Sequence, residues 1–179
     1  MDISKIMAEA IEHGFTRAVP LDISTFDPQQ SVRDLCAAGK CRWFGKSWSC
    51  PPATGTVEDC GGELREYTSG VIVQSTAELE DEFDFETIME LGERHKETFK
   101  EFTRYLNANY SCGLLPLSSD VCDHCEECTY PEAPCRHPDM RMRPIEGYGI
   151  LVSDLCRKNN IPANHGKDTF TYIGCYLFK

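Results

Sequence analysis

The sequence lacks long hydrophobic runs and an apolar N-terminal leader. Stretches such as Val71–Val73 and Ile150–Val152 are far shorter than the ~20 residues that cross a bilayer. The first ten residues, MDISKIMAEA, contain no apolar segment flanked by basic residues, so no signal peptide is predicted. We therefore expect a cytoplasmic protein that does not enter the membrane.

Basic residues are also scarce. The chain has 18 Lys and Arg against 29 Asp and Glu, which gives a formal net charge of −11. A protein that binds nucleic acid or an anionic membrane needs cations to displace counterions. This balance argues against both as general partners.

Familiar catalytic fingerprints are missing. The sequence has no GxGxxG dinucleotide motif, no P-loop and no HExxH zinc motif. Whether the protein is an enzyme therefore stays open at this stage. Its 179 residues, 41% hydrophobic and 26% charged, are typical of one globular domain, residues 1–179.

Hydrophobic periodicity predicts an α+β fold. The strongest helix pattern covers residues 84–109, where apolar positions recur every three or four residues. The best strands are residues 71–75 and 169–178, which are rich in β-branched or aromatic side chains. Shorter helices are predicted over residues 1–14, 28–38, 57–67 and 145–159. The order predicts a small β-sheet covered by helices, with two Cys/Pro-rich metal-binding loops, 39–55 and 111–138, meeting at one end.

The abundant feature is cysteine, with 11 residues. An odd number cannot pair completely in internal disulfides. In a reducing cytosol, clustered cysteines are more often metal ligands or redox groups than disulfides.

The second cysteine set has the more specific spacing. Cys122, Cys125 and Cys128 follow one another at three-residue steps, and Cys135 follows before Arg136-His137-Pro138. A looping backbone with a thiol at every third residue can reach several corners of a cubane cluster, and bacterial ferredoxins use a similar run. Zinc usually draws on two separated pairs, so a zinc site completed by Cys135 or His124 is the alternative.

The first set is less regular in its spacing. It consists of Cys36, Cys41, Cys50 and Cys60, with Pro51-Pro52 fixing the turn after the third cysteine. Trp43, Phe44 and Trp48 lie between these thiols and either shield a cluster or pack in the core. Four thiols in each set predict two [4Fe-4S] clusters. In an alternative mixed arrangement, Cys50, Cys60 or Cys135 ligates the opposite cluster.

Several chemically active residues have a structural interpretation. Cys156 and Cys175 fall in a predicted helix and strand, where buried structural thiols are expected, whereas Cys112 is a candidate substitute ligand. His95 lies on the apolar face of the long predicted helix and is interpreted as a core histidine. The acidic segment 78–86 is interpreted as a solvated loop and helix start, with partner docking as the alternative.

Four runs of the sequence together resemble one family. They are CAAGKCRWFGKSWSCPP (36–52) with Cys60, CDHCEECTYPEAPCRHP (122–138), EGYGILV (146–152) and TYIGCYLF (171–178). They resemble predicted metal-binding proteins of unknown function found mainly in anaerobic bacteria and archaea, over about residues 30–178. The resemblance implies metal binding and no particular reaction. It implies these ligands: Cys36, Cys41, Cys50, Cys60, Cys122, Cys125, Cys128 and Cys135.

Three functions remain open on the sequence alone. The first is an electron-transfer or redox module with two clusters and a redox partner protein. The second is an enzyme with a small-molecule pocket beside a cluster, for which the candidate polar groups are Arg136, His137, Glu146, Tyr148 and the loop 164–167. The third is a zinc-stabilised interaction module.

Overall fold

A five-stranded mixed sheet forms the centre of the protein. The computed structural model describes the backbone of residues 1–179 and every side chain except that of Lys40. The sheet order is β1-β2-β5-β3-β4. Its strands are β1 (Arg17–Pro20), β2 (Ser69–Glu78), β3 (Leu114–Ser118), β4 (Arg143–Pro144) and β5 (Thr169–Phe178). β2 and β5 pair antiparallel along their whole length, and β3 and β4 pair parallel.

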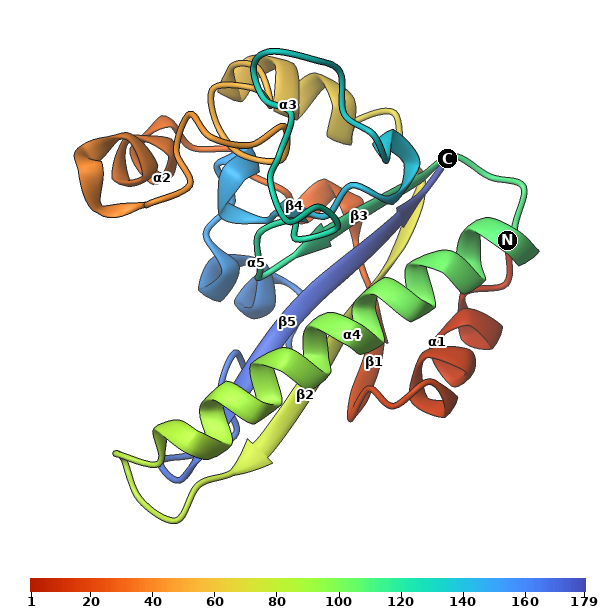
Figure 1. The fold of residues 1–179 in the computed structure, drawn as a ribbon. Coiled ribbons are helices and arrows are strands. Elements are labelled where there is room, and N and C mark those ends of the chain that lie inside the picture. The colour runs from red at the N-terminus through yellow and green to blue at the C-terminus, as the bar shows by residue number, and fades with distance from the viewer.

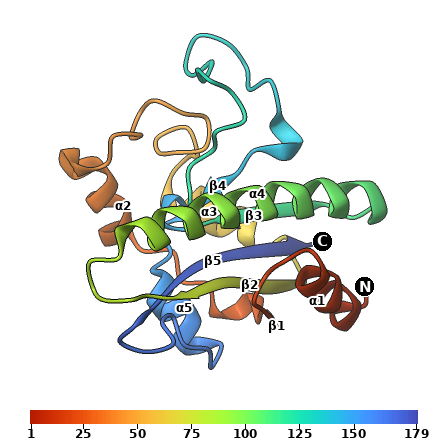
Figure 2. The same cartoon turned by 60° about the horizontal axis from the view of Figure 1, so that its bottom comes forward.

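Helices cover both faces of this sheet (Figures 1 and 2). They are α1 (Ile3–Glu12), α2 (Gln30–Leu35), α3 (Val57–Leu64), α4 (Phe85–Asn109) and α5 (Val152–Lys158). Among the helices that the structure describes, none combines the length and apolarity needed to span a membrane.

Alternation along the strands creates two cores. On β2, Val71 and Val73 pack with α1 and α4, whereas Ile72 faces the other way toward α3 and α5. On β5, Tyr176 belongs to the first core and Cys175 to the second. A side-chain period of two therefore lets one pair of long strands serve both layers.

The predicted α+β class is confirmed, and the long helix and the last strand occur where the periodicity indicated. The prediction was wrong at β3, which lies inside the segment expected to be a loop, because Gly113 and Pro116 hid a short strand that pairs with β5. The helix expected over 145–159 is broken. Gly149, at φ 78°, ends a short 3-10 turn, and α5 begins only at Val152.

His95 is a core histidine in the structure. It is fully buried, and its Nδ1 lies 2.8 Å from the Ser75 hydroxyl on β2. Burial lowers its pKa from 6.5 to about 4, so the ring is neutral at physiological pH. Asp84 caps α4 by accepting a hydrogen bond from the Thr87 N–H, in keeping with the structural interpretation of the acidic segment.

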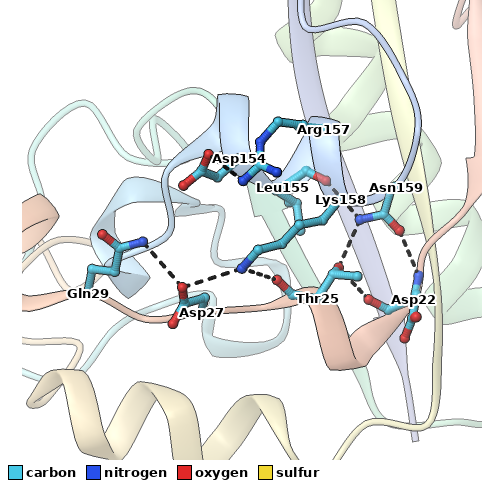
Figure 3. Close-up of polar contacts among 9 residues, drawn as sticks. All are labelled: Asp22, Thr25, Asp27, Gln29, Asp154, Leu155, Arg157, Lys158 and Asn159. Carbon is cyan, nitrogen blue, oxygen red and sulfur yellow. Dashed lines mark hydrogen bonds and ion pairs between the residues drawn. The ribbon is translucent and has the colours of Figure 1, made fainter.

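A polar network joins the end of α5 to the segment before α2 (Figure 3). Lys158 forms an ion pair with Asp27 at 3.3 Å, and Asn159 donates to the Thr25 hydroxyl at 2.8 Å. The Gln29 N–H donates to Gly149 O at 2.8 Å just beyond this network. These contacts fix the start of α2, whose end carries the first cysteine of the first set.

Candidate metal centre

The two cysteine loops lie side by side at one end of the molecule. Figures 1 and 2 show the first loop, in orange to gold, next to the second loop, in teal, away from the turn between β2 and α4. The loops meet as the sequence predicted. The acidic segment 78–86 lies elsewhere, at the turn that leads into α4.

The first loop leaves α2 through a π-helical turn. This turn covers Cys36–Lys40, and Gly39 adopts φ 77°, which lets the chain reverse before Cys41. Cys36 and Cys41 are half-buried, whereas Cys50 is buried. The first loop therefore directs one thiol inward and keeps two nearer the surface.

Cys36, Cys41 and Cys50 are close enough for their charges to interact. Burial raises the pKa of Cys50 to about 12, and the charges of Cys41 and Cys36 add to the shift. Burial also raises the pKa of Cys36, followed by the charge of Cys41. Each negatively charged thiolate disfavours ionisation of the thiols near it. Such a group of thiols is expected where a bound metal cation neutralises the charges.

The second loop brings all four of its cysteines to one cavity. The cavity is small, about 20 Å³, and largely enclosed. Ser47, Trp48 and Ser49 of the first loop form part of its wall, so the two loops build this site together. Its cysteine lining is Cys122, Cys125, Cys128 and Cys135.

Cys128 receives several hydrogen bonds inside this cavity. Burial acts to raise its pKa, but hydrogen bonds from the Trp48 and Tyr130 N–H groups and the Ser47 hydroxyl outweigh it, so the pKa falls. The nearby Arg136 charge acts in the same direction. Donors aimed at a sulfur stabilise the thiolate, which is the form that binds metal.

Trp48 fixes the position of these donors. Its indole N–H donates to Ala133 O at 2.9 Å, and its ring meets Tyr130 edge to face at 5.0 Å. Trp48 thus ties the first loop to the second, beyond the shielding or packing roles expected from the sequence.

The second loop is anchored to α4 on its other side. Asp123 forms ion pairs with Lys100 at 2.9 Å and with Lys96 at 3.6 Å. His124, the alternative zinc ligand of the sequence analysis, is half-buried, with Nε2 2.7 Å from Met140 O. These contacts position Cys122 and Cys125 on either side of the Asp123-His124 pair.

Cys60 lies apart from the other thiols of the first set. It is on α3, fully buried in the core beneath the sheet with Leu64 and Tyr148. Its thiol donates to Thr54 O at 3.3 Å and accepts from Arg33 Nη1 at 3.6 Å. The structure therefore brings seven of the eight predicted ligands to the two loops and directs Cys60 to other partners.

The remaining cysteines occupy structural positions. Cys156 and Cys175 are fully buried in the core, and burial raises the pKa of Cys156 to about 11. Cys112 is half-buried against the core under α1 and α4. These surroundings agree with the structural interpretation of Cys156 and Cys175.

Buried cationic groups surround the loops. Arg141 lines the cavity formed by the cysteines of the second loop. Its Nε is buried without a hydrogen-bond partner among the side chains and backbone that the structure describes. Burial and the neighbouring Arg143 lower the pKa of Arg141. The sequence analysis missed Arg33, Ser47 and Arg141. All three lie close to cysteines in the sequence, which was the one signal that could have identified them. Their contacts with the loops depend on the tertiary fold.

The polar groups considered for an enzyme are mostly engaged in structural contacts. The Tyr148 hydroxyl donates to Glu63 at 2.6 Å, and His165 contacts Gln74 on β2 at 3.2 Å. Glu146 is half-buried, and burial raises the pKa of its carboxyl. The charge of Glu146 contributes to the raised pKa of Cys36.

The donor set has the chemistry of a thiolate metal site. Among the described side chains, no three His, Cys, Asp or Glu residues form a group that could hold a metal ion. Four thiols nevertheless line one cavity, with hydrogen-bond donors and a buried guanidinium around them. Thiolates with such donors around them are the ligands that soft metals and metal–sulfur groups use.

Comparison with known proteins gives one result. No curated protein and no solved structure matches the chain. The family model described as "Predicted metal-binding protein (DUF2284)" matches residues 19–178, which include both cysteine loops and four of the five strands completely. The chain therefore belongs to this family of predicted metal-binding proteins.

Proposed function

We propose that the protein is an iron–sulfur redox module that holds a four-iron cluster at each cysteine set and exchanges electrons with a partner protein. The observation that carries the proposal is the cavity lined by Cys122, Cys125, Cys128 and Cys135, built jointly with the first loop. When bound, a [4Fe-4S] cluster supplies a one-electron couple.

The chain's own residues would hold and tune the metal group. The thiolates of the second loop bind it, and the donors from Ser47, Trp48 and Tyr130 stabilise negative charge on Cys128. Arg141 faces the same cavity and offsets the charge of four thiolates. Electrostatic compensation of this kind is needed because thiolates and sulfides are brought together in a poorly solvated place.

The two metal groups would be neighbours. The charges of Cys122 and Cys128, in the second set, raise the pKa of Cys50, in the first. Thiols that interact electrostatically across the two sets support electron exchange between the sites. The mixed ligation considered from the sequence, with Cys50 serving the second site, remains compatible with this proximity.

A redox partner would dock near the second loop. An open hollow is lined by His124, Cys125, Arg136 and His137, together with Glu126 and Glu127. It places a candidate ligand, Cys125, next to solvent. The acidic segment 78–86 is a less suitable electron exit because it lies away from both cysteine loops (Figure 1).

Anaerobic isolation of the full chain tests the proposal. We expect a brown protein with about eight irons and eight sulfides per chain, and reversible one-electron waves within roughly −700 to +450 mV. Stoichiometric zinc in a colourless anaerobic preparation would overturn the iron–sulfur assignment in favour of a zinc-stabilised module. Iron without a reversible wave would overturn the redox role.

A further inference from the structure

Three large apolar side chains are exposed where the turn after β2 enters α4. Phe83, Phe85 and Met89 are 69%, 64% and 67% exposed to solvent. Phe85 and Met89 lie one turn apart on the same face of α4, and Phe83 precedes them in the turn. A single exposed apolar residue is normal on a folded protein, whereas several together indicate a contact surface. We call these three side chains the apolar tip.

The apolar tip lies beyond the core of the protein. The first buried residue of α4 is Leu91, and no residue of the helix before it belongs to either core. Figure 1 shows this end of α4 at the turn from β2, away from both cysteine loops. A molecule bound at the apolar tip would therefore leave the loops uncovered.

Hydrogen bonds hold the turn in a defined shape. The Asp81 carboxylate accepts from the Phe83 N–H at 2.7 Å, and the Phe85 N–H donates to Phe83 O at 2.7 Å. The Asp84 carboxylate accepts from the Thr87 N–H at 3.1 Å and caps the helix. The backbone that carries the apolar tip is therefore ordered before any partner binds, which reduces the entropy lost on binding.

The surroundings of the apolar tip are acidic. Residues 78–90 include seven carboxylates and no Lys or Arg. In the part of the chain that the structure describes, none of these carboxylates forms an ion pair. The segment hydrogen-bonded to Leu79 carries one lysine, Lys167, directly before Asp168. The negative charge around the tip is therefore left for a partner to neutralise.

We propose that the apolar tip docks a partner protein through a basic amphipathic segment. Apolar side chains of that segment cover Phe83, Phe85 and Met89, and its Lys or Arg residues pair with the carboxylates of residues 78–90. A second copy of this chain would bring the same negative charge to a symmetric contact, and an anionic membrane would repel this end of the molecule. The inference goes beyond the proposed redox function and does not depend on a bound metal.

A peptide titration of the full chain tests the chemistry of the partner. The probe is a fluorescent amphipathic helical peptide of about 18 residues, made of Leu and Lys. Fluorescence anisotropy should show binding that weakens at least about tenfold between about 0.05 M and about 0.5 M salt. The same peptide with Glu in place of Lys should not bind. Absence of binding by the Lys peptide, or equal binding by the Glu peptide, would overturn the inference.

Matched variants test whether the apolar tip is the binding surface. Phe85→Ser should weaken binding of the Lys peptide at least about tenfold. Leu151→Ser, which removes an exposed leucine at the start of α5, should leave the affinity unchanged. Both changes are at exposed positions, so both variants should fold and keep the iron content and redox waves of the wild type. Equal affinities in the two variants would overturn the inference without affecting the proposed function.

A second pair of variants tests the carboxylates. Glu90→Gln should weaken binding about threefold, as expected for one exposed ion pair. Glu101→Gln is the control, because Glu101 is also an exposed glutamate of α4 but lies about 16 Å further along the helix. Equal effects in both variants would mean that the peptide responds to net charge alone, which would overturn the site.

Two further measurements distinguish other occupants. Analytical ultracentrifugation should show no self-association that Phe85→Ser removes, and neutral phosphatidylcholine vesicles should not bind the wild-type chain through this residue. Wild-type dimers that Phe85→Ser dissociates would assign the apolar tip to self-association. Vesicle binding lost in Phe85→Ser would assign it to a membrane. Either result would overturn the basic partner.

Discussion

The face of the sheet under α4 and the pair of cysteine loops are held together in different ways. Under α4, Phe99 stacks on Tyr176 at 4.6 Å, and the Tyr176 hydroxyl donates to Phe99 O. Gly174 permits this approach, since a Cβ there would lie 2.5 Å from Phe99. The loops instead depend on scattered hydrogen bonds, two ion pairs of Asp123 and a collection of thiols.

This difference separates what the chain can do alone from what needs metal. The aromatic core buries large apolar side chains, which is the main favourable contribution to folding. The loops bury an unpartnered Arg141 Nε, which opposes folding without a compensating group. They also bring together thiols whose ionisation to the metal-binding form is disfavoured without metal. We therefore expect the sheet to form without metal and the loops to order with it.

The largest effect should come from removing a ligand of the second set. Cys125→Ala should raise the exchange rates of amide hydrogens in residues 119–142 at least ~1000-fold, equivalent to about 4 kcal/mol of lost local stability. Amides of β2, β5 and α4 should keep their protection. Hydrogen exchange read by mass spectrometry measures both regions in one experiment.

Cys175→Ser provides the control for that comparison. Cys175 is fully buried on β5, away from the loops, so its substitution should destabilise the sheet while iron is retained. Equal iron loss in Cys125→Ala and Cys175→Ser would show that metal binding by the loops depends on the stability of the sheet.

Acid should act on the sheet through His95. The pKa of His95 is about 4 in the folded protein because of burial, against 6.5 in the unfolded chain. The unfolded chain therefore gains a proton first as pH falls, and the free energy of unfolding decreases between pH 6.5 and about 4. The full loss is about 3 kcal/mol, since each pKa unit corresponds to 1.36 kcal/mol.

Denaturant titrations at several pH values measure this loss. His95→Gln removes the titrating group and can keep a contact with Ser75. The free energy of unfolding of the wild type, relative to that of the variant, should therefore decrease as the pH falls from 6.5 to about 4. Parallel stability profiles for the two proteins would contradict this account of His95.

The sequence predicted the sheet region better than the loops because periodicity reports burial. The three- and four-residue spacing of α4 and the β-branched and aromatic content of β5 both reflect faces that pack on a core. β3 was missed because Gly113 and Pro116 resemble loop residues, whereas pairing with β5 decides their conformation. Tertiary contacts overrode local preference there.

For the candidate site, the sequence could predict which cysteines are candidate ligands, but not which other residues surround them. Spacing placed Cys122, Cys125 and Cys128 together, because three-residue steps keep thiols within one loop. Spacing could not show that Cys60 turns toward Arg33, since that depends on where α3 packs. It also could not show that Ser47 crosses from the first loop to the second site.

The smallest expected effect comes from removing the Ser47 hydroxyl, which reaches from the first loop to the cysteine site of the second loop. Ser47 is buried and donates a hydrogen bond to Cys128. Such donors stabilise the more negative, reduced state of a sulfur-ligated centre, so they raise its reduction potential. Ser47→Ala should therefore lower the potential of one of the two waves by about 40 mV, the one-electron equivalent of a ~1 kcal/mol hydrogen bond.

Ser49→Ala makes this prediction specific to the hydrogen bond. Ser49 lies two residues further along the same wall of the cavity and is equally buried, but in the described structure its hydroxyl has no hydrogen-bond partner. Protein-film voltammetry should show little change in this variant, because the same atom is removed without removing a donor to sulfur. Equal shifts in both variants would mean that solvent access, and not hydrogen bonding from the first loop, sets the potential. A shift of both waves in Ser47→Ala would mean that the two cysteine sets do not form electronically distinct sites.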